Sequence, residues 1–69
     1  MLVISNLSEY SVEAIIKLSL NFCEIKNVNK IFDTTTNKFN IMIELNNEKD
    51  EKELSIFLRL VTRLEVDKL

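Results

Sequence analysis

The sequence predicts a small α+β domain in which four strands and two helices follow the order β-α-β-β-α-β. Two stretches repeat apolar residues at helical spacing, and each follows residues typical of a helix N-terminus. Between them, apolar and polar residues alternate with the period of two that marks a strand. The chain has 69 residues, so we expect one domain over residues 1–69, with a small core.

The first strand and the first helix come from the N-terminal part of the chain. The run Leu2-Val3-Ile4 contains two β-branched residues and is typical of a strand. Asn6 or Ser8 can cap the following helix, and Glu9 stands three residues after Asn6, at capping-box spacing. The helix is expected over residues 9–21, with an apolar stripe made of Val12, Ile15, Ile16 and Leu20.

Two strands and a loop are expected to follow. Cys23 and Ile25 share one phase of the alternation, but Val28 falls out of that phase. Such a slip indicates a β-bulge or a strand with apolar residues on both faces. The loop over residues 33–37 lacks glycine, so we expect a connection longer than a tight type I′ turn. The clean alternation of the second strand places these residues on one face: Phe39, Ile41, Ile43 and Leu45.

The last third of the chain predicts a second helix over residues 50–63 and a short fourth strand over residues 65–69. Asp50 and Glu53 have capping-box spacing, and acidic residues are favoured at a helix N-terminus. Phe39, Ile41 and Ile43 are expected to pack against both helices. The helix residues expected in this core are Ile15, Ile16, Leu54, Phe57, Leu58 and Val61.

This element order is that of the ferredoxin-like fold, an antiparallel four-stranded sheet with two helices on one face. The other face is then open, with Val28, Phe32 and Met42, and either Leu2 or Val3, expected on it. Exposed apolar patches commonly meet a partner, so Val28, Phe32 and Met42 are the expected interface. A homodimer, or attachment to a larger parent protein, is expected because the core is small.

Composition argues against several kinds of site. Nine basic and eleven acidic residues give a net charge of −2, which offers no electrostatic attraction for nucleic acid or an anionic membrane. No apolar run approaches the ~20 residues that span a bilayer, and a cytoplasmic location is expected. Without histidine and with Cys23 alone, one chain can form neither a closed zinc site of four nitrogen or sulfur ligands nor an internal disulfide. No metal and no cofactor are expected.

We expect no enzyme activity and no catalytic residues. Asp33 and Glu44 are interpreted as solvated charges, because nothing in the sequence forces them into one cleft. Cys23 shares the phase of Ile25 and is interpreted as a small core residue. RNA binding through the open face is a weaker alternative, since Phe32 is its lone aromatic candidate and the chain is acidic.

Residues 13–45 resemble the ACT domain at the C-terminus of the bifunctional synthetases and hydrolases of the stringent-response alarmone (p)ppGpp. The matching motifs are Cys23-Glu24-Ile25, Asn27-Val28, Phe32-Asp33-Thr34 and Ile41-Met42-Ile43-Glu44-Leu45. ACT domains are small regulatory modules of this element order that pair through strands or helices. The resemblance implies a non-catalytic regulatory and dimerisation domain, with a possible amino-acid effector. The alternative is a ferredoxin-like structural or interaction module without a small ligand.

The resemblance also implies a ligand site between two subunits. The turn over residues 6–10 of one subunit would meet the step at Asn27 and Val28 of another, because a helix N-terminus offers N–H groups to a carboxylate. Glu9 stands where the family commonly has glycine, so its carboxylate is expected to compete with the ligand as a cap. The expected ligand residues are Asn6, Ser8, Glu9, Tyr10, Asn27 and Val28.

Overall fold

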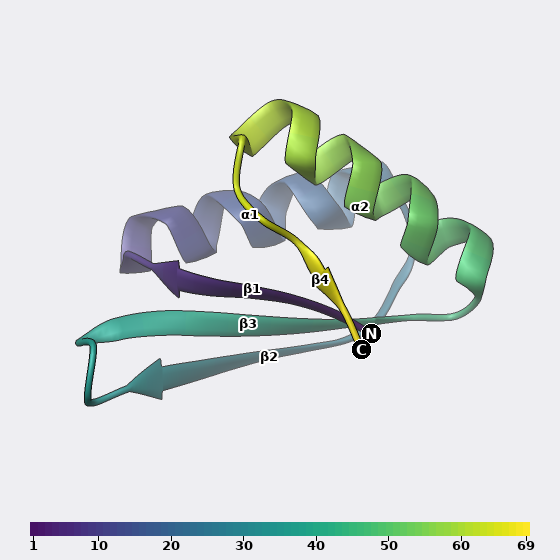
Figure 1. Cartoon of the computed structure of the whole chain (residues 1–69). Helices are drawn as coiled ribbons and strands as arrows, with labels where there is room; N and C mark the ends of the chain where they lie inside the picture. The colour runs from purple at the N-terminus through teal and green to yellow at the C-terminus, as the bar shows by residue number, and fades with distance from the viewer.

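The computed structural model describes all residues, 1–69, as a four-stranded antiparallel sheet with both helices on one face (Figure 1). The sheet order β2-β3-β1-β4 is the ferredoxin-like arrangement, which confirms the predicted fold class. The elements are β1 Leu2–Leu7, α1 Glu9–Phe22, β2 Ile25–Asp33, β3 Lys38–Leu45, α2 Glu48–Thr62 and β4 Asp67–Lys68.

Helix α1 is capped by Ser8, whose Oγ accepts a hydrogen bond from the Ser11 N–H at 3.2 Å. Asn6 lies before the cap, where the pairing of β1 with β3 shifts register, and its φ of 61° is left-handed. The Asn6 N–H donates to Oδ1 of Asn40 at 3.1 Å. The expected capping box of Asn6 and Glu9 is therefore wrong, because Asn6 serves a β-bulge that turns Leu7 into the core.

Helix α2 begins two residues earlier than expected. Asn47 is the cap: its Oδ1 accepts from the Asp50 N–H at 2.8 Å, and its Nδ2 donates to the Asp50 carboxylate at 3.3 Å. The box expected at Asp50 and Glu53 is wrong, because Asp50 already lies inside the first turn. The helix ends at Arg63, whose φ of 62° is left-handed and whose N–H donates to the Arg59 carbonyl.

The β2–β3 hairpin confirms the predicted bulge, which lies between Ile25 and Asn27. Its loop is also longer than a two-residue turn, as expected. The Asp33 carboxylate accepts from the Thr35 N–H at 2.9 Å, and the Asp33 carbonyl accepts from the Asn37 N–H at 2.8 Å. Asn37 takes φ 60°, a left-handed conformation that asparagine tolerates without glycine.

The core lies between the two helices and the central strands β1 and β3. Ile41 and Ile43 are fully buried, which confirms the inward face predicted for β3. The expected core position of Val61 is wrong, because this residue is 52% exposed on the outer side of α2. The eleven core residues are Leu2, Ile4, Leu7, Val12, Ile15, Ile41, Ile43, Leu45, Leu54, Leu58 and Val66.

The bulge changes which residues of β2 face the helices. Directly opposite residues share a face of the sheet, and Val28 lies opposite Ile43 while Phe32 lies opposite Phe39. Val28 and Phe32 are therefore on the helix side, and their expected position on the open face is wrong. Met42 is on the open face as expected, opposite Val3.

Candidate functional site

The most open part of the sheet is strand β2. It has nine residues and pairs only with β3, so one side of its backbone has no partner strand. The other edge strand, β4, has two residues. No residue of β2 is fully buried, and Ile31 and Phe32 are 48% and 46% exposed. A long edge with exposed apolar side chains is a template for pairing with another strand.

Lysines commonly protect an edge strand from such pairing, but both lysines of β2 contact their own sheet. Lys26 Nζ lies 3.7 Å from the Glu44 carboxylate on β3. Lys30 Nζ lies 5.2 Å from the centre of the Phe39 ring, also on β3. These contacts place both ammonium groups near side chains of β3.

Apolar groups reach both faces of this edge. On the helix side, the Phe32 ring meets the Phe39 ring edge-on, with 5.0 Å between centroids. On the open face, Ile31 lies opposite Asn40, next to Met42 along β3. Ile31 was not predicted on this face, because Val28 was expected on the open face and the alternation then puts Ile31 on the helix side. The pairing of Val28 with Ile43 reverses both positions.

The structure separates the two halves of the expected ligand site within one chain. Leu7, at the start of the turn, and Phe32 both lie directly opposite Phe39, so they stand at the same position along the strand direction. Val28 and Leu2 both lie opposite Ile43, so Val28 stands at the other end of β1. The four residue steps from Val28 to Phe32 span about 13 Å of strand. The two halves therefore do not form one site within a single chain.

The turn before α1 is exposed and partly occupied by its own cap. Ser8 takes the Ser11 N–H, so the expectation that the Glu9 carboxylate acts as the cap is wrong. Glu9 is exposed in the first turn, where its charge still opposes an incoming carboxylate. Tyr10 is 85% exposed and lines a shallow hollow of about 230 Å³ that includes Leu64, after the end of α2.

The groups considered for catalysis do not converge. Asp33 binds the hairpin loop and Glu44 pairs with Lys26, at opposite ends of the hairpin. Cys23 is half-buried and packs against the core, and burial, reinforced by Asp50 and Glu53, raises the pKa of its thiol. A raised pKa disfavours the reactive thiolate. No three His, Cys, Asp or Glu side chains lie close enough together to hold a metal ion.

Neither helix is long and apolar enough to cross a membrane. Comparisons with protein-family models, with curated proteins and with solved structures give no match. What the chain does is therefore inferred from its own surfaces.

Proposed function

We propose that this chain is a non-catalytic, cytoplasmic regulatory domain of ACT type that dimerises through the free edge of β2. The observation that carries the proposal is the nine-residue edge strand, whose two lysines contact their own sheet while Ile31 and Phe32 are exposed. The ferredoxin-like sheet order agrees with an ACT domain. A parent protein that makes or degrades (p)ppGpp is supported by the sequence motifs alone.

Two copies of β2 can pair only in certain registers. An antiparallel pair related by a two-fold axis puts both helix layers on the same side, so residues that share a face lie opposite one another. An axis at Lys30 would place the two lysines directly opposite each other, which is unfavourable for like charges. An axis at Asn29 places the two amides opposite each other and Val28 opposite Lys30 of the partner subunit. We therefore expect the axis at Asn29.

This register also changes the level of the partner's Asn27–Val28 step relative to the turn before α1. Val28 of the partner subunit becomes level with Lys30, two residues from the level of Phe32 and Leu7. Along the strand direction, the partner's step lies nearer the end of β1 than Val28 of the same chain does, with β2 and β3 between them. An amino-acid carboxylate would bind the first-turn N–H groups that Ser8 leaves free.

A cysteine at the proposed axis tests the dimer. In an antiparallel pair, opposite Cα atoms are about 4.5–5.5 Å apart, which suits a disulfide. In a Cys23→Ser background, Asn29→Cys should form a covalent dimer under mild oxidation. The matched control is Asn27→Cys, on the same strand and face, whose two copies would lie about 13 Å apart. Efficient cross-linking of Asn27→Cys would show a different register, and a protein that sediments as a monomer at all concentrations would contradict the proposal.

Ligand binding is tested separately, because the dimer does not depend on it. Titration with a branched-chain amino acid should shift the amide signals of residues 6–10 and those of Asn27 and Val28. Glu9→Gln removes only the competing charge, and Glu9→Gly also opens the backbone, so binding should strengthen in that order. A stable dimer without shifts in any of the three proteins would favour the alternative, an interaction module without a small ligand. The Ser8 cap, which already occupies one N–H, favours that alternative.

A further inference from the structure

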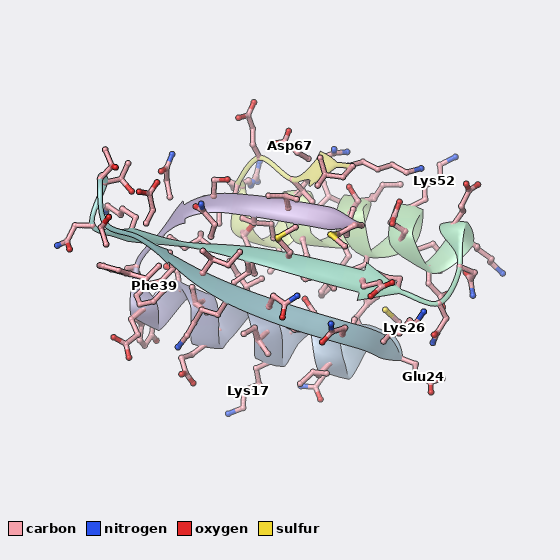
Figure 2. The ribbon with its side chains drawn as sticks, turned by 90° about the horizontal axis from the view of Figure 1, so that it is seen from below. Lys17, Glu24, Lys26, Phe39, Lys52 and Asp67 are labelled. Carbon is pink, nitrogen blue, oxygen red and sulfur yellow. The ribbon has the colours of Figure 1, made fainter.

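A groove of about 460 Å³ between α2 and the β1–β4 side of the sheet collects positive charge in an acidic chain. Four of the nine basic residues line it: Lys49, Lys52 and Arg59 from α2, and Lys68 from β4. Two carboxylates, Glu48 and Glu51, lie beside them. The side chains alone therefore give the groove an excess of positive charge. Lys52 and β4 are visible on this side of the molecule in Figure 2.

One of the two carboxylates is already paired. The Met1 amino group donates a hydrogen bond to Glu51, and Lys68 Nζ lies 3.5 Å from the other Glu51 oxygen. The Glu51 side chain is only 10% exposed, so these partners compensate most of its charge. Lys49, Lys52 and Arg59 then face a single free carboxylate, that of Glu48.

A serine hydroxyl that forms no hydrogen bond within the chain opens into the same groove. Ser55 is 7% exposed and lines the groove, but its hydroxyl makes no hydrogen bond within the chain. Two other helix hydroxyls, those of Ser19 and Thr62, donate to carbonyls four residues earlier, at 2.8 and 2.6 Å. Every fully buried side-chain polar atom has a partner, so the Ser55 oxygen still reaches the groove.

Arg59 is held in place at the groove by the backbone. Its Nη2 donates to the Val66 carbonyl oxygen in the segment that leads to β4. The guanidinium fork has further N–H donors, and its planar geometry suits phosphate oxygens. Leu2 is the one apolar residue in the lining, and no aromatic ring is present for a base to stack on.

We propose that this groove binds the phosphate group of a small molecule through Lys52, Arg59 and the Ser55 hydroxyl. Lysine and arginine supply the opposite charge, and the hydroxyl supplies a hydrogen-bond donor that has no other partner. Because the lining offers no surface for a ring system, the phosphate is the recognised part and any remaining group stays outside. This site lies away from the β2 edge and does not depend on dimerisation.

Amide chemical shifts of the full chain test this site. Sodium phosphate, added at constant ionic strength, should shift residues 48–59 and 66–68, whereas sodium chloride should not. Ser55→Ala and Lys52→Gln should each weaken phosphate binding by about three- to tenfold. The matched controls, Ser19→Ala and Lys17→Gln on α1, should leave it unchanged.

The phosphate source is resolved by comparing inorganic phosphate with ribose 5-phosphate. Tighter binding of the ester identifies a phosphate ester as the ligand, and tighter binding of inorganic phosphate identifies the free ion. Ser55→Ala should not lower the melting temperature, since the hydroxyl it removes has no partner in the chain. Equal affinity of the wild type, Lys52→Gln and Ser55→Ala would overturn the proposal. Lys52 is exposed, so its variant folds and gives a result whatever happens to Ser55→Ala.

Discussion

Strands β2 and β3 form one hairpin and pair along nearly their whole length, yet their side chains have opposite surroundings. On β3, Ile41 and Ile43 are fully buried. The residues directly opposite them on β2 are Lys30, which is exposed, and Val28, which is half-buried. Both pairs lie on the helix side, so the face of the sheet is not the cause. Strand β3 has a neighbour on each side, whereas β2 is an edge.

Because of this difference, the two strands contribute to different processes: β3 to folding of the single chain, and β2 to association between chains. Apolar residues of β3 bury their surface when the single chain folds, at about 25 cal/mol per Å². Ile31 and Phe32 of β2 keep nearly half of their surface in water after folding. That surface can be buried only by association. Substitutions on β3 should therefore change folding, and substitutions on β2 should change assembly.

The largest expected effect is on β3. Ile41→Ala should lower the free energy of unfolding by about 2–5 kcal/mol, because it opens a cavity in a fully buried site. Met42→Ala, on the open face of the same strand, should cost much less. Urea unfolding followed by circular dichroism measures both. Equal losses would mean that the two faces of β3 do not differ as the structure shows.

The next effect is on assembly. Ile31→Lys should weaken dimerisation more than about tenfold, because Ile31 lies on the pairing strand, opposite Asn27 of the partner subunit, and loses exposed apolar surface on association, whereas a lysine there would lose hydration. Monomer stability should change by less than about 0.5 kcal/mol. Sedimentation equilibrium measures the change. Ser5→Lys is the matched control, since Ser5 is exposed on the central strand β1. If Ser5→Lys weakened dimerisation more, the open face around Met42 would be the interface instead of the β2 edge.

A smaller effect is expected at the opposite edge of the sheet, where Glu51 forms ion pairs with the Met1 amino group and with Lys68. The hydrogen bond from the Met1 amino group, aided by Lys68 and opposed by burial, lowers the pKa of Glu51 below its ordinary 4.5. The folded state therefore favours the carboxylate. This contribution to stability is present above pH 4.5 and is lost as pH falls through the lower, folded pKa.

Urea midpoints at neutral pH and at about pH 3 measure this loss. Glu51→Gln should lower stability at neutral pH and reduce its dependence on pH below 4.5. Glu53→Gln, on the exposed side of α2, should keep the wild-type dependence. Parallel pH curves for the wild type and Glu51→Gln would show that other carboxylates cause the acid sensitivity.

The smallest effect is a gain before β4. Arg63 adopts a left-handed conformation that glycine takes without strain. Arg63→Gly should stabilise the chain by about 0.5–1 kcal/mol and raise the melting temperature by a few degrees. Arg63→Ala keeps the strain and should give no gain. A lower melting temperature for the glycine variant would show that the Arg63 side chain stabilises the fold more than the strain costs.

Much of the fold could be predicted because its signals are local. The alternation over β3, the helical stripe of α1 and the phase slip before Val28 each lie within a few residues of one another. Less of the candidate site could be predicted. Val28 and Phe32 were assigned to the wrong face, because the sequence shows that a bulge exists but not how the residues after it are oriented. Asn6 and Ser8 both looked like caps, and the pairing with Asn40 decides between them.

The sequence by itself determined the element order, the inward face of β3 and the absence of histidine, glycine and a second cysteine. Only the tertiary structure decided that β2 is the open edge, that its lysines contact β3, and that Ser55 shares a groove with Lys52, Arg59 and Lys68. The physical reason is the distance along the chain over which each effect acts. Periodicity and capping act over one or two turns of the chain. An edge or a groove exists only after strands and helices from distant segments have packed together.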